Sequence, residues 1–203
     1  MKSKGISLNT MAGYYDLLTP AEKSPLRQKQ IALIALKEGE SVLEVGCGTG
    51  ILSVLAKLAV GEKGKVTGTD IAEKMIHKAK TKAIKYKLNI DFRIASIDQL
   101  PFPDKHFDVI LSSMMFHHLP LAIKKTGLTE LHRILKDDGR ILLSDFGKPT
   151  FYGAPLIFLL LIWIEPTRFQ LLGKLPALIS DSGFKYIKLL KKGSFIRHYL
   201  IKK

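Results

Sequence analysis

Short apolar runs alternate with longer amphipathic stretches along most of the chain. The short runs, closed by Gly, Asp or Ser, predict β-strands. They are Val42–Val45, Val66–Thr69, Ile90–Ala95, Val109–Leu111 and Ile141–Phe146. The longer stretches carry apolar residues every three or four positions and predict helices. They are Pro25–Leu36, Ile51–Val60, Ala72–Lys87 and Leu121–Leu135. Strands separated by such helices predict βαβ units, and therefore a mostly parallel sheet with helices on both faces.

The last part of the chain has a different pattern. A short predicted helix, Pro176–Ser182, precedes two strand-like runs, Phe184–Leu190 and Phe195–Ile201. The residues between these runs, Lys191-Lys192-Gly193-Ser194, are typical of a β-hairpin turn. The patterns together predict an α/β fold with a doubly wound, mostly parallel seven-stranded sheet that ends in an antiparallel hairpin. Neither a repeat nor a linker interrupts the 203 residues, so we expect one domain over 1–203.

Composition narrows the class of protein. Hydrophobic residues make up 46% of the chain and charged residues 25%, as in soluble globular proteins. A single cysteine, Cys47, excludes an internal disulfide and a structural zinc site, which favours a cytoplasmic location. The N-terminal residues lack the apolar core of a signal peptide. The most apolar run, Ala154–Ile164, is shorter than the about 20 residues needed to cross a bilayer.

The charge is strongly positive, with 32 Lys and Arg against 18 Asp and Glu and a net charge of +14. Such a charge attracts nucleic acid, anionic lipid or acidic metabolites, although a lysine-rich solvated surface gives the same composition. The C-terminal segment from Glu165 to Lys203 is the most one-sided part of the chain. Charge alone therefore leaves the partner open.

A glycine-rich turn follows the first predicted strand. Gly46, Gly48 and Gly50 lead directly into the helix that begins near Ile51. Glycines allow sharp turns and a close approach of ligand to main chain, and a helix N-terminus offers free N–H groups to an anion. Ile51 stands where the dinucleotide fingerprint needs a third glycine, and no Gly-Lys-Ser/Thr of a P-loop follows. A turn that serves only the fold remains the alternative.

A carboxylate at the end of the next predicted strand strengthens the prediction of a ligand site. Asp70 closes the next predicted strand, and a carboxylate at that strand end can accept hydrogen bonds from both ribose hydroxyls. The alternative is a solvated residue that caps the following helix. Together, the glycines and Asp70 predict a cleft that holds a nucleoside.

Several motifs in order now resemble a known family, the class I S-adenosylmethionine-dependent methyltransferases. The nearest group contains the ubiquinone/menaquinone C-methyltransferases, a methyltransferase type 11 pattern with a Rossmann-like fold. The motifs are Glu44–Gly50, Asp70, Leu100–Asp104 leading to Phe107–Ile110, Leu131–Lys136 with Gly139, and Tyr15–Leu18. The resemblance implies a division into an N-terminal lid and helix (1–36), a cofactor-binding core (37–146), an apolar cap insert (147–175) and a closing helix with hairpin (176–203).

The resemblance also assigns positions for S-adenosylmethionine and its product S-adenosylhomocysteine. It implies that the glycines let the main chain approach the methionyl part and that Glu44 orients its ammonium group. Asp70 would hold the ribose and Ile71 would pack on adenine, or else in the core. Ser96 replaces the acidic or amide residue that usually contacts the adenine amino group, with the main chain at Ile97 beside it. The full predicted set is Glu44, Gly46, Gly48, Thr49, Gly50, Asp70, Ile71, Ser96, Ile97, Ser113 and Tyr15.

The acceptor side is less defined by sequence. Methyl transfer is an in-line displacement that depends mainly on positioning, and a base is needed only if the acceptor must lose a proton. His117 and His118 are the candidate bases, with packing as the alternative. No histidine spacing suggests a metal ligand. The predicted acceptor contacts are Tyr14, Phe116, Trp163 and Arg168.

Three further expectations concern the partners and the activity of the chain. The apolar segment 151–164 is expected to close over a small lipophilic or aromatic acceptor. Together with the basic C-terminus, it could instead touch a membrane. The alternative is that it forms a buried core helix or a homodimer interface. RNA or other nucleic-acid methylation is disfavoured because the chain lacks an Asn/Asp-Pro-Pro-Tyr/Phe motif. A catalytically inactive cofactor-binding scaffold is disfavoured by the intact glycines and Asp70.

Overall fold

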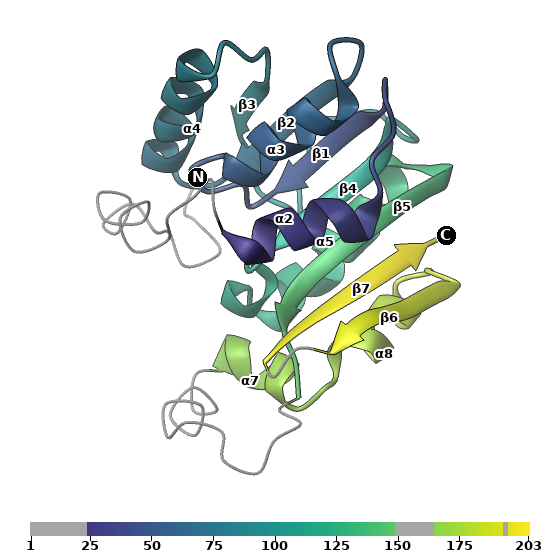
Figure 1. Ribbon diagram of the computed structural model, residues 1–203. Helices are drawn as coiled ribbons and strands as arrows, with labels where there is room; N and C mark the ends of the chain where they lie inside the picture. The colour runs from purple at the N-terminus through teal and green to yellow at the C-terminus, as the bar shows by residue number, and fades with distance from the viewer. Residues whose placement is uncertain (1–23, 149–164, 193–194) are drawn as a thin grey trace.

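The computed structural model describes residues 24–148, 165–192 and 195–203 (Figure 1). One seven-stranded sheet has the order β3-β2-β1-β4-β5-β7-β6. The strands are β1 Ser41–Val45, β2 Lys65–Asp70, β3 Asp91–Ile94, β4 Phe107–Ser113, β5 Leu135–Phe146, β6 Tyr186–Lys192 and β7 Ile196–Lys202. β1 to β5 pair in parallel, whereas β7 is antiparallel to β5 and to β6. The predicted fold class is therefore confirmed.

Helices cover both faces of this sheet (Figure 1). They are α2 Pro25–Ile34, α3 Ile51–Val60, α4 Glu73–Lys85, the 3₁₀ turn η1 Phe116–His118, α5 Leu121–Ile134, α7 Glu165–Leu171 and α8 Leu175–Asp181. No helix within the described ranges is long and apolar enough to span a membrane. The apolar segment 151–164 lies outside the described residues.

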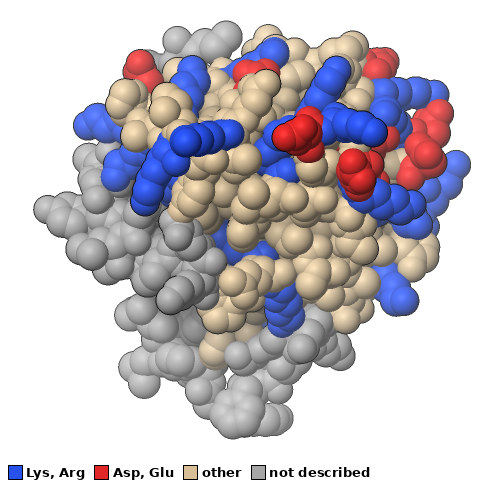
Figure 2. Space-filling view, turned by 45° about the horizontal axis from the view of Figure 1, so that its top comes forward, with Lys and Arg blue, Asp and Glu red and all other residues tan. Residues whose placement is uncertain are grey.

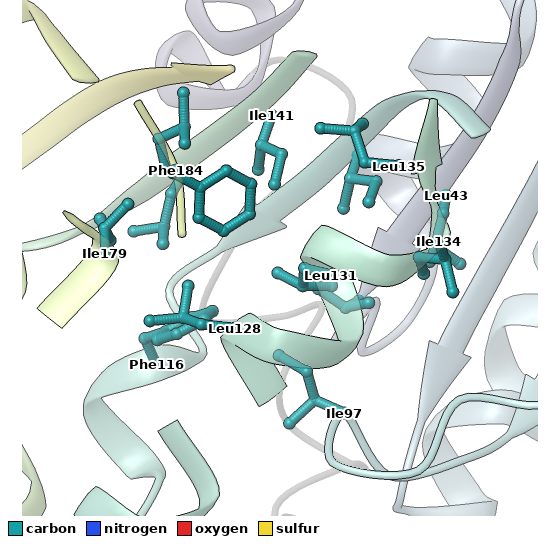
Figure 3. Packing of buried hydrophobic residues seen from close by; sticks show 14 of the residues in the cluster. Leu43, Ile97, Phe116, Leu128, Leu131, Ile134, Leu135, Ile141, Ile179 and Phe184 are labelled. Atoms are coloured by element: carbon teal, nitrogen blue, oxygen red, sulfur yellow. The ribbon is translucent and has the colours of Figure 1, made fainter. Parts of the chain in front are cut away.

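Successive side chains along a strand point to opposite faces of the sheet and therefore pack into two hydrophobic cores. Val42 of β1 packs with Ile34 of α2 and Leu52 of α3 on one face. The next residue, Leu43, packs on the other face with Leu131 of α5 in the larger cluster of Figure 3. Because both faces of the central strands are covered, these strands are apolar at consecutive positions, as expected for a buried parallel sheet.

Two features differ from the prediction. β5 begins at Leu135, well before the expected Ile141, because Leu135 pairs with Phe107 across a register shift in β4. The polar sequence Lys136–Gly139 does not have the pattern of a strand, so the early start was not predicted. Lys136 Nζ is 2.6 Å from Asp108 Oδ1, and this ion pair fixes the strand end. The turn η1 after β4 was also not predicted, and it determines where His117 and His118 lie.

Candidate active site

A cavity lies at the carboxyl ends of the parallel strands. Segments that follow β1, β2, β3 and β4 line it, and α2 and α5 contribute one wall each. β1 is flanked by β2 on one side and by β4 on the other, which makes this the point where strand order reverses. Open α/β sheets bind ligands at such a switch point. The position of the cavity therefore follows from the topology.

The glycine turn forms the cavity floor after β1. Gly46, Gly48 and Gly50 have φ angles of 67°, 53° and 77°, a region that side chains disfavour. Gly46 and Gly48 line the cavity, whereas Gly50 does not. A Cβ on Gly50 would lie 2.7 Å from Phe92 Cζ and 2.8 Å from Ala79 Cβ. Gly50 therefore serves the packing of α3 against α4, and not a ligand contact.

Asp70 ties this turn to the end of β2. Its Oδ2 accepts the Gly48 N–H at 2.9 Å, and its Oδ1 accepts the Ala72 N–H at 2.9 Å. Burial raises the pKa of this carboxyl, while the main-chain donors oppose that effect. Asp70 and its neighbour Ile71 both line the cavity. Each carboxylate oxygen still has acceptor capacity for a hydroxyl group.

The predicted adenine contacts, Ser96 and Ile97, also line the cavity, next to Met75 of α4. The Ser96 hydroxyl donates to the Asp98 carboxylate, which orients the serine oxygen. Ile71, Ile97 and Met75 supply apolar surface at this end. An aromatic base would therefore meet apolar walls with a serine at one edge.

Two predicted residues lie behind the cavity wall. Glu44 is 1% exposed, and its carboxylate accepts a hydrogen bond from the Ser53 hydroxyl of α3. Burial raises the pKa of Glu44 to about 7, opposed by Ser53 and by the positive charge of Arg27. Thr49 is 3% exposed and accepts a hydrogen bond from Lys82 Nζ at 2.9 Å. Neither side chain lines the cavity.

Sequence reasoning missed the contribution of α2. Arg27 lines the cavity beside the glycine turn. One turn later, the fully buried Gln30 donates from Nε2 to Ser113 Oγ at 2.8 Å, and Ser113 also lines the cavity. Arg27 and Gln30 belong to a helix with no ligand motif, and 83 positions separate Gln30 from Ser113. No local pattern could have indicated this contact.

The part of the cavity wall that follows β4, called the apolar end below, is apolar except for one histidine. Met114, Met115, Leu119 and Ile123 line it together with His118. Burial lowers the pKa of His118 to about 4, and its neighbour His117 contributes to the lowering. This end provides a nonpolar chamber with a neutral imidazole in its wall.

His117 faces away from the cavity. It is 8% exposed, and its Nδ1 lies 2.8 Å from Asp145 Oδ1 at the end of β5. The structure thus separates the two histidines that sequence treated as equivalent: His118 lines the cavity, and His117 is paired behind it.

The predicted acceptor contacts are placed differently. Phe116 is 0% exposed and belongs to the large core cluster (Figure 3), so its assignment to the acceptor is corrected. Arg168 is exposed on α7 and does not line the cavity. Tyr14, Tyr15 and Trp163 lie outside the described residues.

Comparisons with known proteins match this architecture. Residues 42–139 match the family model described as a methyltransferase domain. The demethylmenaquinone methyltransferase of Tropheryma whipplei is 31% identical over 173 residues, which cover 83% of this chain and 70% of that protein. That of Listeria welshimeri is 27% identical over 201 residues, with 87% and 84% covered. The chain covers only 55% of the ubiquinone/menaquinone biosynthesis C-methyltransferase UbiE of Vibrio vulnificus, at 31% identity.

A solved structure agrees along nearly the whole chain. A SAM-dependent methyltransferase from Aquifex aeolicus superposes with a TM-score of 0.75 and 25% identity, covering 95% of this chain and 97% of that one. The chain therefore belongs to the class I S-adenosylmethionine-dependent methyltransferases. Within that class it falls in the ubiquinone/menaquinone C-methyltransferase-like group.

Proposed function

We propose that this chain methylates a lipophilic, quinone-type small molecule at the apolar end of its cavity. The observation that carries the proposal is the make-up of the cavity wall, in which Asp70 and the glycine turn are joined by the apolar side chains of Met114, Met115, Leu119 and Ile123. The names of the relatives, demethylmenaquinone methyltransferases, support an acceptor of this class. Apolar side chains in this part of the wall suit a hydrophobic ring and disfavour a charged polymer.

The residues present fit S-adenosylmethionine. The bare main chain at Gly48, where a Cβ would meet nothing within 4 Å, offers room for the methionyl part, and Arg27 is placed to attract its carboxylate. Asp70 would accept hydrogen bonds from the ribose, and Ile71 would pack against adenine near Ser96 and Ile97. Glu44, Thr49 and Gly50 would act from behind by holding the turn. When bound, the cofactor supplies a methyl group on a positively charged sulfur.

The chain's own contribution is mainly position. The glycine turn and Asp70 fix one reactant, and the apolar end fixes the other while keeping water from the reacting atoms. Holding two reactants about 3 Å apart in a near-attack geometry supplies much of what such a displacement requires. No side chain needs to form a covalent bond.

The proposal extends to segments outside the described residues. We assign the lid to 1–36, with Tyr15 over the cofactor and Tyr14 toward the acceptor, and the cap to 147–175, with Trp163 beside the acceptor. The same cap and the basic C-terminus are proposed to touch a membrane, from which a lipophilic acceptor would come. A homodimer through the apolar cap is the competing proposal, which a sedimentation measurement with and without vesicles would separate.

A screen with methyl-labelled cofactor tests the proposal. The acceptors are a reduced demethylated naphthoquinone, a phospholipid, a small amine and RNA, and Asp70→Ala is the negative control. We expect label to appear only in the reduced quinone and to disappear in the variant. Label in RNA alone, with none in the quinone, would refute the proposal.

A further inference from the structure

A buried hydrogen-bonded pair, His117 and Asp145, lies behind the apolar end of the cavity. Asp145, 1% exposed at the end of β5, accepts the His117 main-chain N–H at 3.2 Å and the Phe146 N–H at 2.6 Å. Its Oδ1 also lies 2.8 Å from His117 Nδ1. With the carboxylate as acceptor, His117 carries its proton on Nδ1, and its ring orientation is fixed.

His118 packs against the His117 ring, whose orientation is fixed in this way. The ring centroids of His117 and His118 are 3.9 Å apart, and Phe146 packs on the His117 ring at 4.6 Å. The Thr167 hydroxyl of α7 also donates to the His117 carbonyl at 3.3 Å. These contacts hold η1 in one arrangement, with His118 in the wall of the cavity. Among the described residues lining the apolar end, His118 is the one titratable side chain.

We propose that His118 accepts the proton of a hydroxyl group on the acceptor, and that the buried His117–Asp145 pair positions His118 for this step. The inference rests on the proposed function and narrows it to acceptors of the phenol or quinol class. His118 would then be a catalytic residue, and His117 and Asp145 positioning residues.

The chemistry explains why a weak base suits a hydroxyl. His118 is neutral near pH 7, because burial and His117 lower its pKa to about 4. A free phenol, with a pKa near that of tyrosine, about 10, would not give its proton to such a group. Once the acceptor gains the methyl group, however, positive charge spreads onto the acceptor and its O–H becomes strongly acidic. The O–H bond then breaks, its electron pair stays on oxygen and neutralises that charge, and the proton passes to His118 and on to water.

An amine acceptor would not fit this base. A methylated amine keeps its proton with a pKa near that of lysine, about 10, far above that of His118. The groups that act on the His118 pKa are His117 in the same turn, which lowers it, and Asp145 on β5, which raises it; Arg27 and Asp70 line the same cavity. A base at His118 therefore serves a hydroxylated acceptor and has no task with an amine.

The first test compares two ligands that differ by one hydroxyl, 1-naphthol and naphthalene, titrated calorimetrically in the presence of S-adenosylhomocysteine. We expect the wild type to prefer naphthol about fivefold to tenfold, the effect of one net hydrogen bond. His118→Ala should lose this preference, while S-adenosylhomocysteine affinity stays within about twofold. The matched control is His77→Gln, an exposed histidine on α4.

A second variant separates binding from proton transfer. The amide oxygen of His118→Gln can accept a hydrogen bond but cannot take a proton. We expect it to keep the naphthol preference and to lower kcat with a hydroxylated acceptor about 10²-fold or more, as expected for loss of a general base. An unchanged naphthol preference and unchanged kcat in His118→Ala would overturn the inference.

The positioning pair is tested by NMR titration of the His118 ring. Asp145 raises the pKa of His118 and His117 lowers it, so Asp145→Asn should lower that pKa and His117→Asn should raise it. Because these shifts follow from charge alone, positioning is read from kcat: both variants should lower kcat with a hydroxylated acceptor and leave S-adenosylhomocysteine affinity within about twofold, and an unchanged kcat would refute the positioning. If the wild type methylates no hydroxylated compound but retains the His118-dependent naphthol preference, the proposed function fails while the binding inference stands.

Discussion

The Asp70 carboxylate has two tasks, since it receives main-chain N–H groups from Gly48 and Ala72 and also faces the cavity. Asp70→Ala removes the acceptor of a ribose hydroxyl pair and releases the turn. We expect S-adenosylhomocysteine affinity to fall about 10²-fold or more, because hydrogen bonds to charged groups contribute about 1.5–3 kcal/mol each. Calorimetric titration measures this, with the exposed Asp91→Asn on β3 as control. An unchanged dissociation constant would place the cofactor elsewhere.

Arg27 allows a test of how the cofactor is oriented in the cavity. Among the described residues lining the cavity, it is the one Lys or Arg. Arg27→Gln should weaken S-adenosylhomocysteine about tenfold or more, because a charge-assisted hydrogen bond to its carboxylate is lost. Methylthioadenosine has the same nucleoside but no amino-acid carboxylate, so its affinity should change less than about twofold. Equal losses for both ligands would mean that Arg27 only supports the fold; Lys29→Gln on the same helix is the control.

At the scale of elements, the glycine turn between β1 and α3 contains two different constraints. A Cβ on Gly50 would collide with Phe92 and Ala79, whereas one on Gly48 meets nothing within 4 Å. Gly50→Ala should therefore lower the free energy of unfolding by about 2–4 kcal/mol through backbone strain and overpacking. Gly48→Ala should cost about 1–2 kcal/mol from its backbone alone but should weaken S-adenosylhomocysteine binding more strongly. Chemical denaturation and calorimetry of both variants check this; equal destabilisation would contradict it.

The same elements show what sequence can and cannot predict. Apolar periodicity located most strands and helices, and the glycine turn with Asp70 indicated where the cavity lies, because these signals are local. The early start of β5 was missed because its first residues are polar and pair across an irregular register. The contacts of Gln30 with Ser113 and of His117 with Asp145 join residues far apart in the chain. Only the sheet order brings them together.

At the scale of the whole molecule, charge and catalysis are separated. Figure 2 shows Lys and Arg side chains over much of one face, with Asp and Glu gathered in fewer places. On the face shown, Lys and Arg lie at the surface, whereas the cavity is lined mostly by small and apolar residues. One ionisable group, Glu44, is buried within the central sheet.

Glu44 makes the stability of the whole chain depend on pH. Its pKa is raised from the usual 4.5 to about 7 by burial, so the folded state holds this proton more tightly than the unfolded chain does. Stability from the protonated form is complete below about pH 4.5 and is lost as pH rises through about 7. The difference between the two pKa values, about 2.5, corresponds to about 3 kcal/mol.

Glu44→Gln isolates this effect, because the amide stays neutral and can still accept the Ser53 hydroxyl. We expect the wild type to lose about 3 kcal/mol relative to the variant between pH 4.5 and pH 8. Groups common to both proteins, including Asp70, cancel in this difference. Urea unfolding at several pH values measures it. Parallel curves would show that Glu44 keeps its usual pKa, and hence that water or Arg27 solvates it behind the cavity wall.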